Sequence, residues 1–106
     1  MNTQDIKKLM QVALTAHQEG EFSKAIDHYQ QVLALKFDHL PALINLAGLF
    51  KKQGNLRKAS EHYTRALSLD KESPELWFNY GNLLAQQGRL DAAKRAFRSA
   101  LDIRPD

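Results

Sequence analysis

One turn sequence recurs three times along the chain at a constant interval. Gly20, Gly54 and Gly88 stand 34 residues apart (54 − 20 and 88 − 54), and an alanine follows each of them five positions later. The same register, without a gap, aligns bulky apolar residues in all three copies: Phe22, Leu56 and Leu90; Tyr29, Tyr63 and Phe97; Leu33, Leu67 and Leu101. A short unit of this kind buries its apolar face only against its neighbours, so the pattern predicts three stacked copies of one supersecondary unit.

The apolar spacing within a unit is that of two amphipathic helices. In the middle unit one helical face carries Leu43, Leu46, Ala47 and Phe50, and a second face carries Leu56, Ala59, Tyr63, Ala66 and Leu67. Each unit is therefore predicted to be a helical hairpin whose glycine closes the first helix in the left-handed conformation. Ser73, before Pro74, is expected to cap the first helix of the third unit, and Asp38 with Pro41 to do so more loosely in the second.

These elements predict one all-α domain. We expect an α-solenoid of three antiparallel hairpins, at residues 6–39, 40–73 and 74–106, after an N-terminal extension at 1–5. The chain of 106 residues contains no cysteine, which excludes disulfides and thiolate metal sites and suits a reducing compartment. Its N-terminus lacks a secretory h-region, and its most apolar stretch, residues 40–50, is too short to span a membrane. A cytoplasmic protein without membrane contact is expected.

Catalytic and metal-binding patterns are weak. No serine stands in a pattern with a partnered histidine, and neither type of glycine-rich phosphate loop occurs. The chain has four histidines, none of which forms an i, i+4 pair on one predicted helix: His17, His28, His39 and His62. We interpret them as solvated surface residues. Neither enzyme activity nor a cofactor nor a metal is expected.

The repeat resembles a known family through its third unit. Residues 77–81 read W-x-x-Y-G, and the family's later positions are matched by Ala93, Phe97, Ala100 and Pro105. This 34-residue pattern is similar to the tetratricopeptide repeat, and the resemblance covers residues 6–106. The first unit departs most, with Leu9 for the usual tryptophan, Ala16 for a larger residue and Phe37 for the closing proline. The resemblance implies a right-handed superhelix whose first helices line a concave groove.

Two rows of side chains are expected to form the floor of that groove. Met10, Ile44 and Phe78 make an apolar row, interpreted as facing water, and an amide row of Gln11, Asn45 and Asn79 could pair with the backbone of an extended peptide. The predicted peptide-binding residues are Met10, Gln11, Leu14, Ile44, Asn45, Lys51, Lys52, Phe78, Asn79 and Asn82. The two asparagines resemble the ladder that holds peptide backbone in O-GlcNAc transferase repeats. Equally, the amides could merely fill gaps between helices.

The predicted function is a protein–protein interaction scaffold that binds a peptide or helix of a partner protein. One subclass of the family clamps the EEVD tail of chaperones with lysines, asparagines and an arginine. Of its five positions this chain keeps Asn45, and Met10, Leu14, Glu75 and Asn79 occupy the others. Most of the positive charge is absent, so no EEVD binding is expected.

Three other functions remain open from the residues. Basic residues such as Lys51, Lys52, Arg57 and Lys58 could contact nucleic acid, but interleaved acids such as Glu61 argue against it. The chain could be the N-terminal targeting segment of a longer enzyme, such as a glycosyltransferase. A homo-oligomer through the C-terminal helix is the third alternative, because an uncovered apolar edge is expected at Phe97, Ala100, Leu101 and Ile103.

Overall fold

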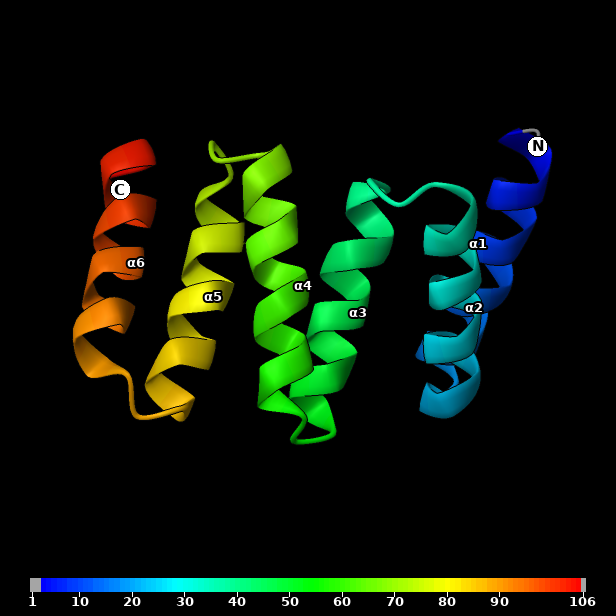
Figure 1. Ribbon diagram of the computed structural model, residues 1–106, viewed down its shortest axis with the longest axis horizontal. Coiled ribbons are helices and arrows are strands. Elements are labelled where there is room, and N and C mark those ends of the chain that lie inside the picture. Colours follow the sequence, from blue (N-terminus) through cyan, green and yellow to red (C-terminus); the bar gives the residue numbers. More distant parts are fainter. Residues whose placement is uncertain (1–2, 106) are drawn as a thin grey trace.

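The computed structural model describes residues 3–105 and shows six helices and no strand within them. The helices are α1 (Thr3–Gln18), α2 (Phe22–Leu35), α3 (Leu40–Lys52), α4 (Leu56–Leu69), α5 (Pro74–Gln86) and α6 (Leu90–Ile103). The three hairpins follow one another along the long axis of the molecule, with N and C at opposite ends (Figure 1). The molecule is correspondingly elongated, at 40 × 25 × 22 Å.

Helices pair in chain order and the pairs then stack. Within the hairpins α1 packs against α2, α3 against α4 and α5 against α6. Successive hairpins are joined by contacts of α3 with α2 and of α5 with α4. A main apolar core runs through the first two hairpins into α5, and a smaller cluster around Leu84, Ala93 and Ala96 lies inside the third. The predicted all-α solenoid of helical hairpins is confirmed. Each first helix thus occupies the same position in its repeat and can contribute to one continuous surface.

The three glycine turns share one geometry. Gly20, Gly54 and Gly88 have φ values of +79°, +82° and +78°, which side chains with a Cβ rarely adopt. At the second turn the N–H of Gly54 donates to the Lys51 carbonyl at 2.9 Å, and the N–H of Asn55 donates to the Phe50 carbonyl at 2.8 Å. This pair of bonds is a Schellman motif. The predicted role of the glycines as helix ends is confirmed.

The caps of the first helices agree with the sequence in one repeat and differ in another. The Ser73 hydroxyl accepts a hydrogen bond from the Leu76 N–H at 3.2 Å, as predicted for an N-cap. In the second repeat the cap is His39, whose Nδ1 accepts from the Ala42 N–H at 3.2 Å, so the prediction of Asp38 is wrong. The reason is position: His39 directly precedes α3, and Asp38 lies one residue too early to reach its first free amides.

The predicted extension at 1–5 falls in two parts. Residues 3–5 belong to α1, and Met1 and Asn2 lie outside the described residues, as does Asp106 at the other end. Among the described helices none is long and apolar enough to cross a bilayer.

Candidate peptide-binding groove

The predicted apolar row differs in exposure from one repeat to the next. Met10 and Ile44 are half-buried and pack against the main core, whereas 53% of Phe78 is exposed. The interpretation that all three face water is therefore wrong for the first two, which have a packing role of their own. Leu14, on the same helix as Met10, is 37% exposed. Among the large apolar side chains of the three first helices, Phe78 on α5 is the most exposed.

The predicted amide row likewise divides into engaged and available groups. Asn45 hydrogen-bonds to the hydroxyl of buried Tyr29, which also lies 3.2 Å from Nδ1 of His17. Gln11 donates to the Thr15 hydroxyl at 3.4 Å along the surface of α1. Neither Asn79 nor Asn82, both half-buried, has a hydrogen-bond partner within residues 3–105. Asn45 thus bridges two repeats, while the amides of α5 retain their full hydrogen-bonding capacity.

Two equivalent tyrosines show the same division. Burial raises the pKa of Tyr29 above its ordinary value of 10.0, and the hydrogen bond with Asn45 offsets part of that rise. Burial also raises the pKa of Tyr63, which stands 34 residues later, but no hydrogen bond offsets it. The residue at the corresponding distance from Tyr63 is Asn79, so this amide is not held by the tyrosine as Asn45 is. Both phenols stay neutral at physiological pH.

The two lysines predicted at the edge of the groove are placed differently from each other. Lys51 is half-buried, and Lys52 is exposed with its Nζ 4.8 Å from the centroid of the Phe22 ring. This cation–π contact ties the end of α3 to the start of α2. The charge of Lys52 remains accessible to an acidic ligand, but its side chain already has a partner in the preceding hairpin.

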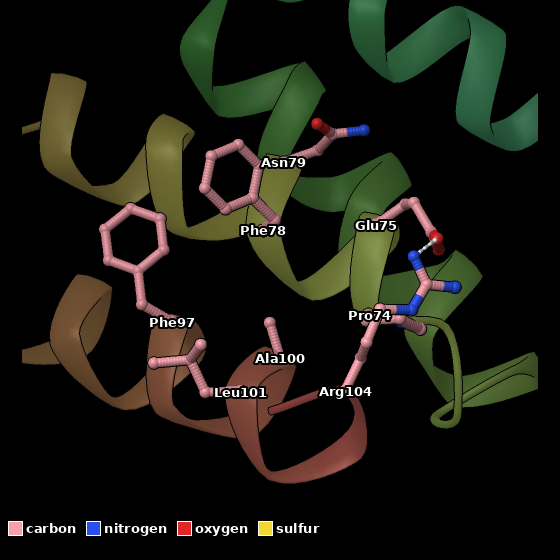
Figure 2. Close-up of a pocket in the computed structure, with 8 residues that line it drawn as sticks. All are labelled: Pro74, Glu75, Phe78, Asn79, Phe97, Ala100, Leu101 and Arg104. Carbon is pink, nitrogen blue, oxygen red and sulfur yellow. Dashed lines mark ion pairs between the residues drawn. The ribbon is translucent and has the colours of Figure 1, made fainter. Parts of the chain in front are cut away.

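An apolar pocket of about 430 Å³ lies at the C-terminal end of the stack. Its lining comes from α5 and the residues of α6 and beyond: Pro74, Glu75, Phe78, Asn79, Phe97, Ala100, Leu101 and Arg104. Phe78 and Phe97 lie on one side with ring centroids 5.6 Å apart, and Glu75 pairs with Arg104 on the other (Figure 2). The sequence indicated the apolar residues of α6 but missed the pocket and the two charges at its rim. The 34-residue register alone does not place Glu75 and Arg104 next to each other. Their place at the rim of the pocket follows only once the packing of α5 against α6 is known.

The histidines take local structural roles. Nδ1 of His28 and Nδ1 of His62 lie 2.9 Å and 2.8 Å, respectively, from the carbonyl oxygen four residues earlier. The His62 ring also packs on Phe50. They and His17 are half-buried rather than freely solvated, which corrects the interpretation of these residues as solvated surface. Over residues 3–105 no group of three or more histidine, aspartate or glutamate side chains could hold a metal ion.

Models of the tetratricopeptide repeat match residues 7–72 and residues 44–106. The chain belongs to the tetratricopeptide-repeat family. Such repeats are typically interaction modules without catalytic activity, and this chain carries the helical solenoid that goes with them. No curated protein sequence matches it.

Solved structures of the same fold align over nearly the whole chain. A mutant O-GlcNAc transferase of Thermobaculum terrenum aligns at 30% identity and a TM-score of 0.87, covering 100% of this chain and 21% of the transferase. MamA aligns at 22% identity and a TM-score of 0.89, covering 94% of this chain and 55% of MamA. The first tetratricopeptide domain of Spaghetti (RPAP3), bound to the HSP90 peptide SRMEEVD, aligns at 17% and 0.90, covering 100% of this chain and 84% of that domain. This chain therefore spans about half of MamA and a fifth of the transferase.

Proposed function

We propose that the chain binds an extended peptide or a short helix of a partner protein along its first helices, with α5 as the main contact. The observation that supports this most is that two available side chains stand next to each other on α5: Phe78 is exposed, and the amide of Asn79 has no hydrogen-bond partner among the described residues. An aromatic side chain supplies apolar contact area, and an amide can both donate to and accept from a peptide backbone. Peptide binding by a related fold, as in the RPAP3 complex, is consistent with this proposal.

The two asparagines have different roles in this mode of binding. Asn45 is committed to Tyr29, so it acts by holding the second repeat against the first. Asn79 contacts the ligand. Met10, Gln11, Leu14, Ile44, Lys51, Lys52 and Asn82 extend the same surface and set its apolar and basic character. A shallow groove of this size supports affinities in the micromolar range.

A peptide-display library selected on the parent chain tests this assignment. Selected peptides are measured by fluorescence anisotropy against Asn79→Ala and against Gln30→Ala, a control on the exposed surface of α2. We expect Asn79→Ala to weaken binding about tenfold, the loss of one or two backbone hydrogen bonds, and Gln30→Ala to leave it unchanged. Equal affinities for the parent and Asn79→Ala would refute the assignment.

The groove is proposed not to accept the EEVD tail of chaperones. Glu75 occupies one of the clamp positions, so an acid stands where a carboxylate-binding clamp needs a cation. The arginine beside it, Arg104, is already paired with Glu75 at 3.0 Å. Calorimetry with the peptide SRMEEVD, with the RPAP3 domain as the positive control, checks this directly. The proposal would be contradicted if this chain bound the peptide with an affinity equal to that of the control.

The proposed role is non-enzymatic and is carried out in the cytoplasm. Nucleic acid is not proposed as a partner. The alternative of a repeat segment within a longer enzyme is favoured by one observation, the 30% identity to a transferase of which this chain spans 21%. An immunoblot of source cells decides between them. A band near the 12.1 kDa of this chain supports the free scaffold, and only a much larger band supports the longer enzyme.

A further inference from the structure

The second helices of the last two repeats carry equivalent residues in different surroundings. Leu67 on α4 is 6% exposed, and Leu101, its equivalent on α6, is 58% exposed. Tyr63 is likewise buried while Phe97 is half-exposed. The cause is that α5 packs on α4, and no helix within residues 3–105 packs on the corresponding side of α6. Within residues 3–105, the C-terminal face of α5 and α6 is thus without the neighbouring helix that covers the equivalent face of α4.

This face has the composition of an interface. Its centre is the apolar pocket of about 430 Å³, between Phe78 and Leu101. At its rim Glu75 and Arg104 form an ion pair of 3.0 Å in which both side chains stay largely exposed. An apolar centre with a charged, solvent-accessible rim is the usual anatomy of a protein interface.

We propose that this C-terminal face binds the same face of a second copy of the chain, related by a two-fold axis. The charges argue for this occupant. In a two-fold pair each surface meets itself, so Glu75 of one copy can approach Arg104 of the other twice, and Phe78 and Leu101 close over the two pockets. Because Phe78 also belongs to the proposed peptide site, the dimer and the peptide complex exclude each other at this position. The face carries both signs of charge side by side and is therefore complementary to itself.

Head-to-tail stacking fits less well than the two-fold pair. At the internal junctions the position that meets the preceding second helix holds Ala42 or Leu76, which are 0% and 2% exposed. The equivalent position on α1 is the exposed Lys8. Stacking α1 of one copy on α6 of another would bring that ammonium group against the apolar side chain of Leu101 and remove it from water, a cost that the internal junctions do not have.

Sedimentation equilibrium over about 10 to 500 µM tests the proposal, with two leucines of α6 as a matched pair. Leu101 and Leu90 are 58% and 60% exposed, but only Leu101 lines the pocket. We expect a monomer–dimer equilibrium in the parent, a dissociation constant raised about tenfold or more by Leu101→Lys, and no change with Leu90→Lys. Circular dichroism checks that both variants are folded. A monomeric parent at the highest concentration, or equal effects of the two substitutions, overturns the proposal.

A charge exchange separates the two-fold pair from any other arrangement. Glu75→Arg leaves two cations at each face and Arg104→Glu leaves two anions, so each variant alone should be monomeric. Mixed together, they should form a heterodimer, because every cross-contact between positions 75 and 104 is again attractive. Failure of the mixture to dimerise overturns the two-fold arrangement. Species larger than a dimer in the parent, reduced by Val12→Glu on α1, would overturn it in favour of head-to-tail stacking.

Discussion

The second and third hairpins have nearly the same pattern of residues but not the same packing. α4 is covered on both sides, by α3 in its own hairpin and by α5 from the next, and it buries Ala59, Tyr63, Ala66 and Leu67. Within residues 3–105, α6 packs mainly against α5, and its buried residues are Ala93, Ala96 and Ala100. The difference teaches that the repeat sequence determines the hairpin, whereas the burial of its second helix depends on the repeat that follows.

Truncating one leucine in each hairpin should give the largest difference. Leu67→Ala removes a side chain that is 6% exposed and should lower the free energy of unfolding by roughly 2–5 kcal/mol. Leu101→Ala removes one that is 58% exposed and should change it by less than about 0.5 kcal/mol. Urea denaturation at low protein concentration, where any dimer dissociates, measures both. Similar losses in the two variants would show that the hairpins are equivalently packed.

A second comparison concerns the small residue on each first helix. Ala47 is fully buried in α3, whereas a Cβ on its equivalent, Gly81, would lie 2.6 Å from Cε1 of Phe97. Gly81→Ala must displace the ring and should cost about 1–2 kcal/mol despite the better helix propensity of alanine. In the background Phe97→Leu the same substitution should instead stabilise by up to about 1 kcal/mol. A double-mutant cycle by thermal unfolding checks this, and additive effects would exclude the contact as the cause.

The smallest expected effect is a pH dependence of the cap on α3. Burial, aided by Lys36 and opposed by Asp38, lowers the pKa of His39 below its ordinary value of 6.5. A lowered pKa means that the unfolded chain binds the proton first, so the stability from this cap is complete above pH 6.5 and is lost as the pH falls through the folded pKa. The protonated ring cannot accept from the Ala42 N–H.

His39→Ser isolates that contribution, because serine caps the equivalent helix at Ser73. Between pH 7.5 and pH 5 the parent should lose a part of the ~1 kcal/mol typical of a cap that the variant does not lose. Melting temperatures of both proteins across this range provide the measurement. Parallel pH profiles would mean that His39 does not cap α3 in solution.

The hairpins, their order and their glycine turns could be predicted from the sequence because periodicity and left-handed backbone are local properties. Contacts between repeats could not. Asn45 has its role because Tyr29 of the preceding repeat lies beneath it, and Glu75 meets Arg104 across 29 positions of the chain. Even the cap of α3 depended on where the helix begins, since Asp38 and His39 are both capable acceptors. Exposure along the apolar row differed for the same reason, because Met10 and Ile44 pack against neighbouring helices.

Amide hydrogen exchange of α4 and α6 tests most directly whether the following repeat determines the packing of a second helix. Exchange is measured at a protein concentration low enough to keep the chain monomeric. Because opening α4 also disrupts its contact with α5, we expect its amides to be the better protected, and those of α6 to exchange through local opening of the third hairpin. Protection in α6 equal to or greater than that in α4 would contradict this account.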